Sequence, residues 1–306
     1  PPQDGRSIAR LMPTTPPAAT SLWHRLRQGQ LGAGWMIVAS LLFALMGLFV
    51  KLGSAHFSAI ELVFYRTFVG MLGIAGVVLV RRQSLATAHI VPHLKRSLFG
   101  YAALSLYFYA ITELPLATAV TLNYTSPLFL AGISVFWLKE KLSGRLGLSL
   151  LLGFVGVVLL LKPTLAKDAW LAGVLGLVSG FLASIAYQHV RELGRLGEPE
   201  WRVVFYFTVI ANGLGGVWLA VAQGFRPLDM ENIPLLIGLG ATATLAQLAM
   251  TRAYQEGRKL VVANLAYLTV VFSSAIGVVM WGDILPPESY VAMGLIVASG
   301  MIASRR

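Results

Sequence analysis

Apolar residues fall into long runs that are separated by short polar links from residue 31 onward. A bilayer core is about 30 Å thick, and a helix needs about 20 mostly apolar residues to cross it. The pattern therefore predicts an all-α membrane protein with ten transmembrane helices. The predicted spans cover 31–52, 59–80, 97–113, 116–138, 145–161, 170–190, 201–222, 233–253, 260–281 and 288–304.

Composition supports a lipid environment. Charged residues make up 12% of the chain, against about 25% in soluble domains, and hydrophobic residues make up 57%. The net charge of +11 does not indicate a nucleic-acid partner, because the basic residues lie between apolar runs. The chain has no cysteine, which excludes disulfides and thiolate metal sites. Residues 1–30 lack an apolar run and are predicted to form a flexible cytoplasmic tail.

The basic residues also predict how the helices are oriented. Most of the 24 Lys and Arg residues fall in alternate links, on the side of both termini. Only Lys51, Lys162, Lys167 and Arg226 fall on the opposite side, and Arg66 lies within the second span. Links rich in Lys and Arg stay in the cytoplasm. Both termini are therefore predicted to be cytoplasmic.

The two halves of the chain resemble each other at a nearly constant offset. Tyr267 lies 143 residues after Tyr124, and Phe205 lies 141 residues after Phe64. The predicted repeats are residues 31–161 and 170–304. Because five spans is an odd number, the second repeat must run in the opposite direction through the membrane. Inverted repeats of this kind enclose a central ligand cavity in many secondary transporters.

Three features carry a family resemblance: the ten short helices, residues 123–127 (Asn-Tyr-Thr-Ser-Pro) and the turn Glu140-Lys141-Leu142. With these features the chain resembles the drug/metabolite transporter superfamily, and within it the EamA-type exporters. The resemblance implies efflux of amino acids and other small metabolites across the bacterial inner membrane. The chain is most similar to exporters of aromatic and neutral amino acids. It also implies a cavity lined by spans 1, 3, 4, 6, 8 and 9, a small-molecule partner, no cofactor and a monomer.

The second repeat departs from the first at two points. Val270 lies where the first repeat has Pro127, and Asp283 replaces Glu140. These differences leave the functional equivalence of the two halves open.

Polar residues near the middle of the fourth span are the first candidate binding site. Proline removes a backbone donor and frees a carbonyl one turn earlier. With Asn123, Tyr124, Ser126 and Pro127, that carbonyl could bind the ammonium or carboxylate of an amino acid. The alternative is a simple kink whose free backbone groups are satisfied by neighbouring hydroxyls.

Further candidates lie in the second half and in the third span. Tyr267 and Asn264 lie in the ninth span, and Tyr267 is predicted to face Tyr124 across the cavity. Gln247 belongs to a polar stripe on one face of the eighth span. Tyr109 lies near the end of the third span, at the position that corresponds to Arg252. Ordinary helix packing with hydroxyls bonded between helices is the alternative.

Three charged or titratable residues are candidates for coupling or gating. His189 could carry a proton, or it could simply lie at the cytoplasmic interface. Arg66 could be a structural ion pair or snorkelling side chain, or it could contact an anion near the outer gate. Arg252 ends the polar stripe of the eighth span. Asp and Glu are absent from the centre of every predicted span, so coupling uses another group or transport is facilitative.

The sequence also limits the competing functions. It contains neither a His-Glu-x-x-His motif nor a Walker A motif, so it predicts no metal site and no ATP hydrolysis. An enzyme is not expected. A channel-like facilitator, and an exporter of nucleoside-like, sugar-like or cationic compounds, remain as alternatives to an amino-acid exporter that works by alternating access.

Overall fold

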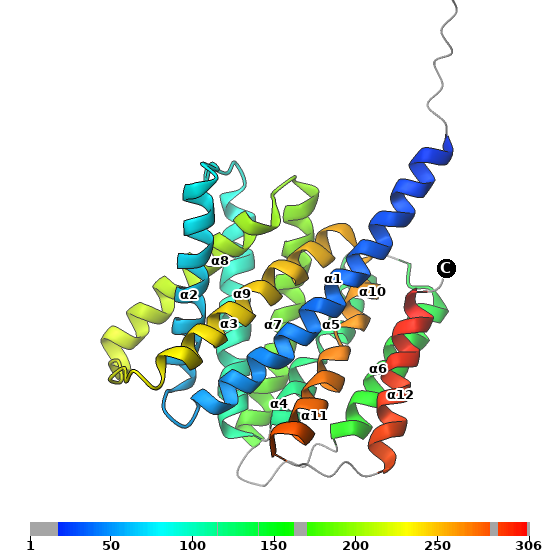
Figure 1. Cartoon of the computed structure of the whole chain (residues 1–306). Coiled ribbons are helices and arrows are strands. Elements are labelled where there is room, and N and C mark those ends of the chain that lie inside the picture. The colour runs from blue at the N-terminus through cyan, green and yellow to red at the C-terminus, as the bar shows by residue number, and fades with distance from the viewer. Residues whose placement is uncertain (1–17, 115, 140, 162–169, 282–286, 305–306) are drawn as a thin grey trace, which may run out of the picture.

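The computed structural model describes residues 18–114, 116–139, 141–161, 170–281 and 287–304. Within these ranges every regular element is a helix (Figure 1). The helices are α1 (Ala18–Gly53), α2 (Ala59–Val80), α3 (Ile90–Glu113), α4 (Leu116–Asn123), α5 (Ser126–Gly132), η1 (Ile133–Trp137), α6 (Gly144–Leu161), α7 (Trp170–Arg195), α8 (Glu200–Trp218), η3 (Leu219–Gln223), α9 (Ile233–Glu256), α10 (Lys259–Leu265), α11 (Leu268–Trp281) and α12 (Pro287–Ser304).

These elements form ten passes of one helical bundle. Three of the passes consist of more than one element, namely α4–α5–η1, α8–η3 and α10–α11, and each of these covers one predicted span. Within the described ranges, six helices are long and apolar enough to cross a membrane, and shorter apolar helices cover 126–137, 144–159 and 290–299. The predicted fold class is confirmed. Three boundaries differ from the prediction by five residues or more, since α1 begins at Ala18, α3 begins at Ile90 and α7 ends at Arg195.

The early start of α1 makes residues 18–30 helical, whereas the sequence assigned them to the tail. The rest of the predicted tail, residues 1–17, lies outside the described residues. So do Glu140 and Asp283, which carried part of the family resemblance and of the difference between the repeats.

Helices of the two halves pack in matching pairs. The α1–α9 contact corresponds to the α7–α3 contact when the halves are exchanged, and α2–α9 corresponds to α8–α3. The contacts α2–α8 and α6–α12 each join one helix to its own counterpart. An inverted repeat produces this pattern, because a twofold axis in the membrane plane carries each helix contact onto its counterpart in the other half.

The fourth and ninth passes are both interrupted at the same point. α4 ends at Asn123 and α5 begins at Ser126, while α10 ends at Leu265 and α11 begins at Leu268. The backbone forms tight turns at each interruption. At the first one, Thr125 N–H donates to the carbonyl three residues earlier (3.3 Å). Pro127 lies in the first turn of α5, where a missing N–H costs no intrahelical bond.

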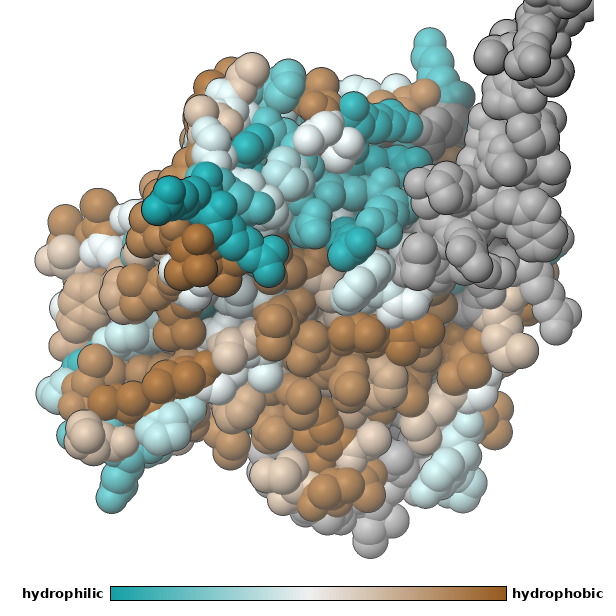
Figure 2. All heavy atoms as spheres, turned by 45° about the horizontal axis from the view of Figure 1, so that its top comes forward, coloured by the Kyte–Doolittle hydropathy of each residue, from teal (hydrophilic) through white to brown (hydrophobic). Residues whose placement is uncertain are grey.

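The outer surface divides into an apolar band and a polar end. Figure 2 shows hydrophilic side chains gathered at the end of the bundle that faces up in Figure 1, with an apolar surface below them. Exposed basic residues at this end include Arg81, Lys95 and Arg195, and the aromatic residues Phe136 and Trp137 at the end of the fourth pass are 87% and 81% exposed. Such exposed aromatic rings are compatible with lipid rather than water.

A cluster of charged and polar side chains joins two links at the polar end of the bundle. Glu198 accepts hydrogen bonds from Thr87 and from Arg202 (2.9 Å), and the buried imidazole of His93 lies 3.4 Å from its carboxylate. Burial raises the pKa of Glu198, but the hydrogen bonds from Thr87 and Arg202 and the charge of Arg202 outweigh it and leave the pKa below its usual value. This carboxylate therefore stays ionised near neutral pH and ties the link after α2 to the link before α8.

Candidate functional site

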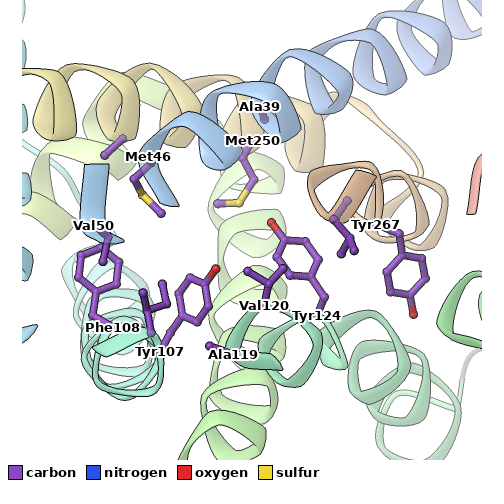
Figure 3. Packing of buried hydrophobic residues seen from close by; sticks show 14 of the residues in the cluster. Ala39, Met46, Val50, Tyr107, Phe108, Ala119, Val120, Tyr124, Met250 and Tyr267 are labelled. Carbon is purple, nitrogen blue, oxygen red and sulfur yellow. The ribbon is translucent and has the colours of Figure 1, made fainter. Parts of the chain in front are cut away.

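A cavity of about 80 Å³ lies inside the bundle, between helices of both halves. Tyrosine, phenylalanine and methionine side chains form much of its wall. Figure 3 shows Tyr107 and Tyr124 pointing toward the space below Met46 and Met250. The lining residues that the argument below uses are Phe43, Arg66, Arg96, Gly100, Ala103, Tyr107, Asn123, Tyr124, Tyr187, Phe207 and Gln247.

Four of the residues proposed from sequence meet in this cavity. Asn123 and Tyr124 reach it because they lie at the interruption between α4 and α5. The Asn123 side-chain amide donates to Ser179 Oγ of α7 (2.9 Å). Arg66 of α2 points its Nη2 at Gln247 Oε1 of α9 (3.4 Å), which is long for a charged hydrogen bond.

The ninth pass does not line the cavity. Tyr267 is fully buried and points away from Tyr124 (Figure 3), because its ring occupies the space that Gly153 leaves on α6. The Asn264 amide donates to Ser149 Oγ of α6 (2.9 Å). The expectation that Tyr124 and Tyr267 face each other across the cavity is therefore wrong in geometry, and both ninth-span residues bind α6 instead.

Three other candidates from the first half are also outside the lining. Ser126 and Pro127 are buried in the first turn of α5, one turn beyond the interruption. Tyr109 is partly buried against the hydrophobic core on a different side of α3 from Tyr107. None of the three is therefore part of the cavity lining.

His189 and Arg252 lie closer to the polar end. His189 Nδ1 is 2.8 Å from Glu192 Oε2, and its ring stacks on Phe99. Arg252 pairs with Glu256 one turn later (2.8 Å) and lies over the Trp35 ring. Each has a local partner of its own, and neither lines the cavity.

The structure adds cavity residues that the sequence reading missed, above all Arg96, Tyr107 and Tyr187. Arg96 was assigned to a cytoplasmic link because the third span was drawn from residue 97. Since α3 begins at Ile90, Arg96 is helical and shares one face with Gly100, Ala103 and Tyr107. The spacing of these four residues follows the helical period, which is a signal that the sequence already contained.

The charge of the cavity is positive. Arg66 is 4% exposed and Arg96 is 3% exposed. The Arg96 guanidinium lies 3.9 Å from the Phe207 ring centroid, and Arg66 lies 5.8 Å from that of Phe108. No Asp or Glu is among the described residues of the cavity wall, and no group of three His, Asp or Glu residues in the described part of the chain could hold a metal.

Comparison with known proteins identifies the family. Residues 30–162 match the EamA-like transporter family. The chain is 30% identical to the pseudopaline exporter CntI of Pseudomonas aeruginosa over 272 residues, which cover 88% of this chain and 94% of that protein. The chain belongs to the EamA-like transporter family.

Other EamA-like relatives differ in the cargo that their names state. A riboflavin transporter of Vibrio cholerae is 28% identical over 291 residues, covering 91% of this chain and 93% of its own. An S-adenosylmethionine uptake transporter of Rickettsia bellii is 24% identical, covering 81% and 84%. A crystal structure with a TM-score of 0.71 and 21% identity, covering 87% of this chain and 94% of its own, shares the fold. This protein is therefore a membrane transporter of small molecules and not an enzyme.

Proposed function

We propose that the protein is an alternating-access carrier that exports amino acids and related small metabolites, with aromatic and neutral amino acids as the first candidates. The observation that carries the proposal is a central cavity whose walls come from both halves of an inverted fold. The aromatic rings of the wall can pack against the apolar side chain of an amino-acid substrate, while Asn123 and Gln247 offer amide groups to its polar backbone groups.

The size of the cavity supports motion during transport. About 80 Å³ is smaller than the cavity of about 150 Å³ that takes up benzene in a protein core. The helices must therefore separate when a metabolite enters. Two halves that pack in matching pairs can rock against each other, which widens the cavity toward one side at a time.

We further propose that the chain lies in the bacterial inner membrane as a monomer, with both termini in the cytoplasm. The basic links support this orientation, because the exposed Arg81, Lys95 and Arg195 share one end of the bundle. The cavity lies within one chain, so a second copy is not needed to complete it.

Flux in proteoliposomes tests the proposal. Vesicles holding the purified full chain are loaded with labelled tryptophan, phenylalanine, threonine or methionine, with and without a pH gradient. A carrier gives saturable efflux that unlabelled substrate on the far side accelerates. Efflux that is linear in concentration and shows no such counterflow would indicate a channel, and the absence of flux for every amino acid would refute the proposed substrate class.

A further inference from the structure

Two arginines of the cavity carry charge that the protein does not neutralise. Other arginines in the described residues form ion pairs, among them Arg202 with Glu198, Arg226 with Glu61 and Arg252 with Glu256. By contrast, no carboxylate among the described residues lies within ion-pair distance of Arg66 or Arg96.

Arg96 also has donors without a partner. Its Nε and Nη1 are buried and donate to no acceptor among the described residues, since Arg96 is only 3% exposed. The Phe207 ring and the bare Cα of Gly100 lie next to the guanidinium, and neither offers it an acceptor. Buried guanidinium groups normally find an acceptor, because an unpaired buried charge is costly.

Gly100 keeps this guanidinium in place. A Cβ at residue 100 would lie 2.8 Å from Arg96 Nη1, so any larger residue there would displace the charged group. The glycine thus lets the side chain fold along α3 and face the cavity instead of extending toward the polar end. Arg66 reaches the same cavity from α2, where it makes the long hydrogen bond to Gln247 as its polar contact with the described residues.

We propose that Arg66 and Arg96 bind two carboxylates of the cargo, so that the preferred substrates are small organic anions with two acidic groups. The inference rests on the proposed transport function, and within it puts acidic amino acids and dicarboxylates ahead of the aromatic and neutral amino acids. A guanidinium presents a planar fork of N–H donors that matches a carboxylate, and two forks in one cavity match a dicarboxylate. The wall contributes no described carboxylate to hold an ammonium group, so a zwitterion with one carboxylate uses only half of the site.

Binding is tested first, because it does not depend on flux. The full chain in detergent is heated with succinate, glutamate, glutamine or inorganic phosphate at equal concentration. Succinate and glutamate are expected to raise the unfolding temperature, and glutamine and phosphate are expected to raise it less. Stabilisation by glutamine equal to that by glutamate would overturn the proposal. Stronger stabilisation by phosphate than by either dicarboxylate would overturn the assignment to carboxylates.

Variants then assign the effect to the two arginines. Arg66→Gln and Arg96→Gln are each expected to lower glutamate counterflow at least about tenfold, since each removes a hydrogen-bonded charge from the bound anion. Arg96→Lys keeps the positive charge but loses the planar pair of N–H donors, and Gly100→Ala displaces the Arg96 guanidinium. Both variants should therefore give intermediate losses of glutamate counterflow. Lys95→Gln is the matched control, because Lys95 is exposed on the same helix. Its flux is expected to remain at the wild-type level.

The two proposals fail in different ways. In one outcome, dicarboxylates stabilise the wild type, Arg66→Gln and Arg96→Gln each abolish this stabilisation, and no dicarboxylate is transported. That outcome would support the anion site and refute transport of these compounds. Flux of neutral amino acids that is insensitive to both variants would support the carrier and overturn the anion site. Size-exclusion profiles of the variants that match the wild type ensure that a loss reflects the site and not unfolding.

Discussion

The interruptions in the fourth and ninth passes have the same backbone and different side-chain roles. Tyr124 at the first interruption lines the cavity, whereas Tyr267 at the second is buried against α6. The flanking asparagines differ in the same way, because Asn123 lines the cavity and Asn264 bonds to Ser149 outside it. Repetition of the backbone therefore did not preserve the cavity wall, and the polar groups that line the cavity come mainly from the first half.

The comparison also shows what makes the interruption. Only the first half has a proline near it, since Val270 corresponds to Pro127. In both halves, however, the first helix of the opposite repeat crosses at the break. α7 crosses at Gly180, where a Cβ would lie 2.9 Å from the Asn123 carbonyl, and Ser40 of α1 donates to the Leu265 carbonyl (3.4 Å). Close helix crossing is the feature that the halves share, and proline is an addition.

The difference between the tyrosines has a steric origin on α6. At the offset of 143 that aligns the tyrosines, Gly153 of α6 corresponds to Ile296 of α12. A Cβ at residue 153 would lie 2.6 Å from the Tyr267 ring, so this pocket exists only because the residue is glycine. The two interruptions are 142 residues apart and the tyrosines 143, so Tyr267 takes the place in the second break that Thr125 has in the first, and its ring lies against α6 where the glycine leaves room.

The largest expected effect is on stability. Tyr267→Ala removes a fully buried ring and should lower the free energy of unfolding by about 3 kcal/mol, because it leaves a cavity beside Gly153. Tyr124→Ala should cost less, since that ring already borders open space. Thermal unfolding of the two variants in the same detergent measures the difference. Equal losses would show that the two tyrosines are packed alike.

Filling the space beside Tyr267 should have the next largest effect. Gly153→Ala introduces a methyl group that overlaps the ring and is expected to cost about 2 kcal/mol. Gly294→Ala on α12 is the control, because nothing lies within 4 Å of the added Cβ. That variant should be neutral or slightly stabilised, since alanine favours a helix more than glycine does. Equal melting temperatures for the two variants would contradict the steric explanation.

Removing a single hydroxyl separates the roles of the tyrosines in transport. Tyr124→Phe should lower the flux of a polar cargo about fivefold, the equivalent of one neutral hydrogen bond of about 1 kcal/mol. Tyr267→Phe should leave flux unchanged, because its hydroxyl has no hydrogen-bond partner among the described residues. Initial rates at equal reconstituted protein provide the measurement. A loss in Tyr267→Phe as large as that in Tyr124→Phe would place both hydroxyls in the transport path.

The smallest effect is expected from the proline. Pro127→Ala should change the free energy of unfolding by about 0.5 kcal/mol or less and retain most of the flux, because the second half forms the same break around Val270. Thermal unfolding and counterflow of this one variant are sufficient. A large loss of flux in a stably folded Pro127→Ala protein would show that the two interruptions have different causes.

The sequence predicted the fold well because crossing a bilayer constrains helix length and hydropathy directly. The predicted span 59–80 matches α2, and most other boundaries lie within a few residues of the observed ones. The binding surface was harder to predict, because an apolar helix does not reveal which of its faces points inward. Arg66, Asn123, Tyr124 and Gln247 were identified by polarity, but Arg96 was hidden by the late start drawn for the third span.

The unpaired guanidinium groups of Arg66 and Arg96 have an electrical consequence. A cargo that leaves the cell with one net negative charge moves down an inside-negative potential, and 100 mV favours its exit by about 2.3 kcal/mol. This energy sustains an outward concentration ratio of about fiftyfold at equilibrium, since about 1.4 kcal/mol corresponds to a factor of ten. A carrier built around two arginines could therefore be powered by the membrane voltage itself, without a carboxylate to carry protons through the bundle.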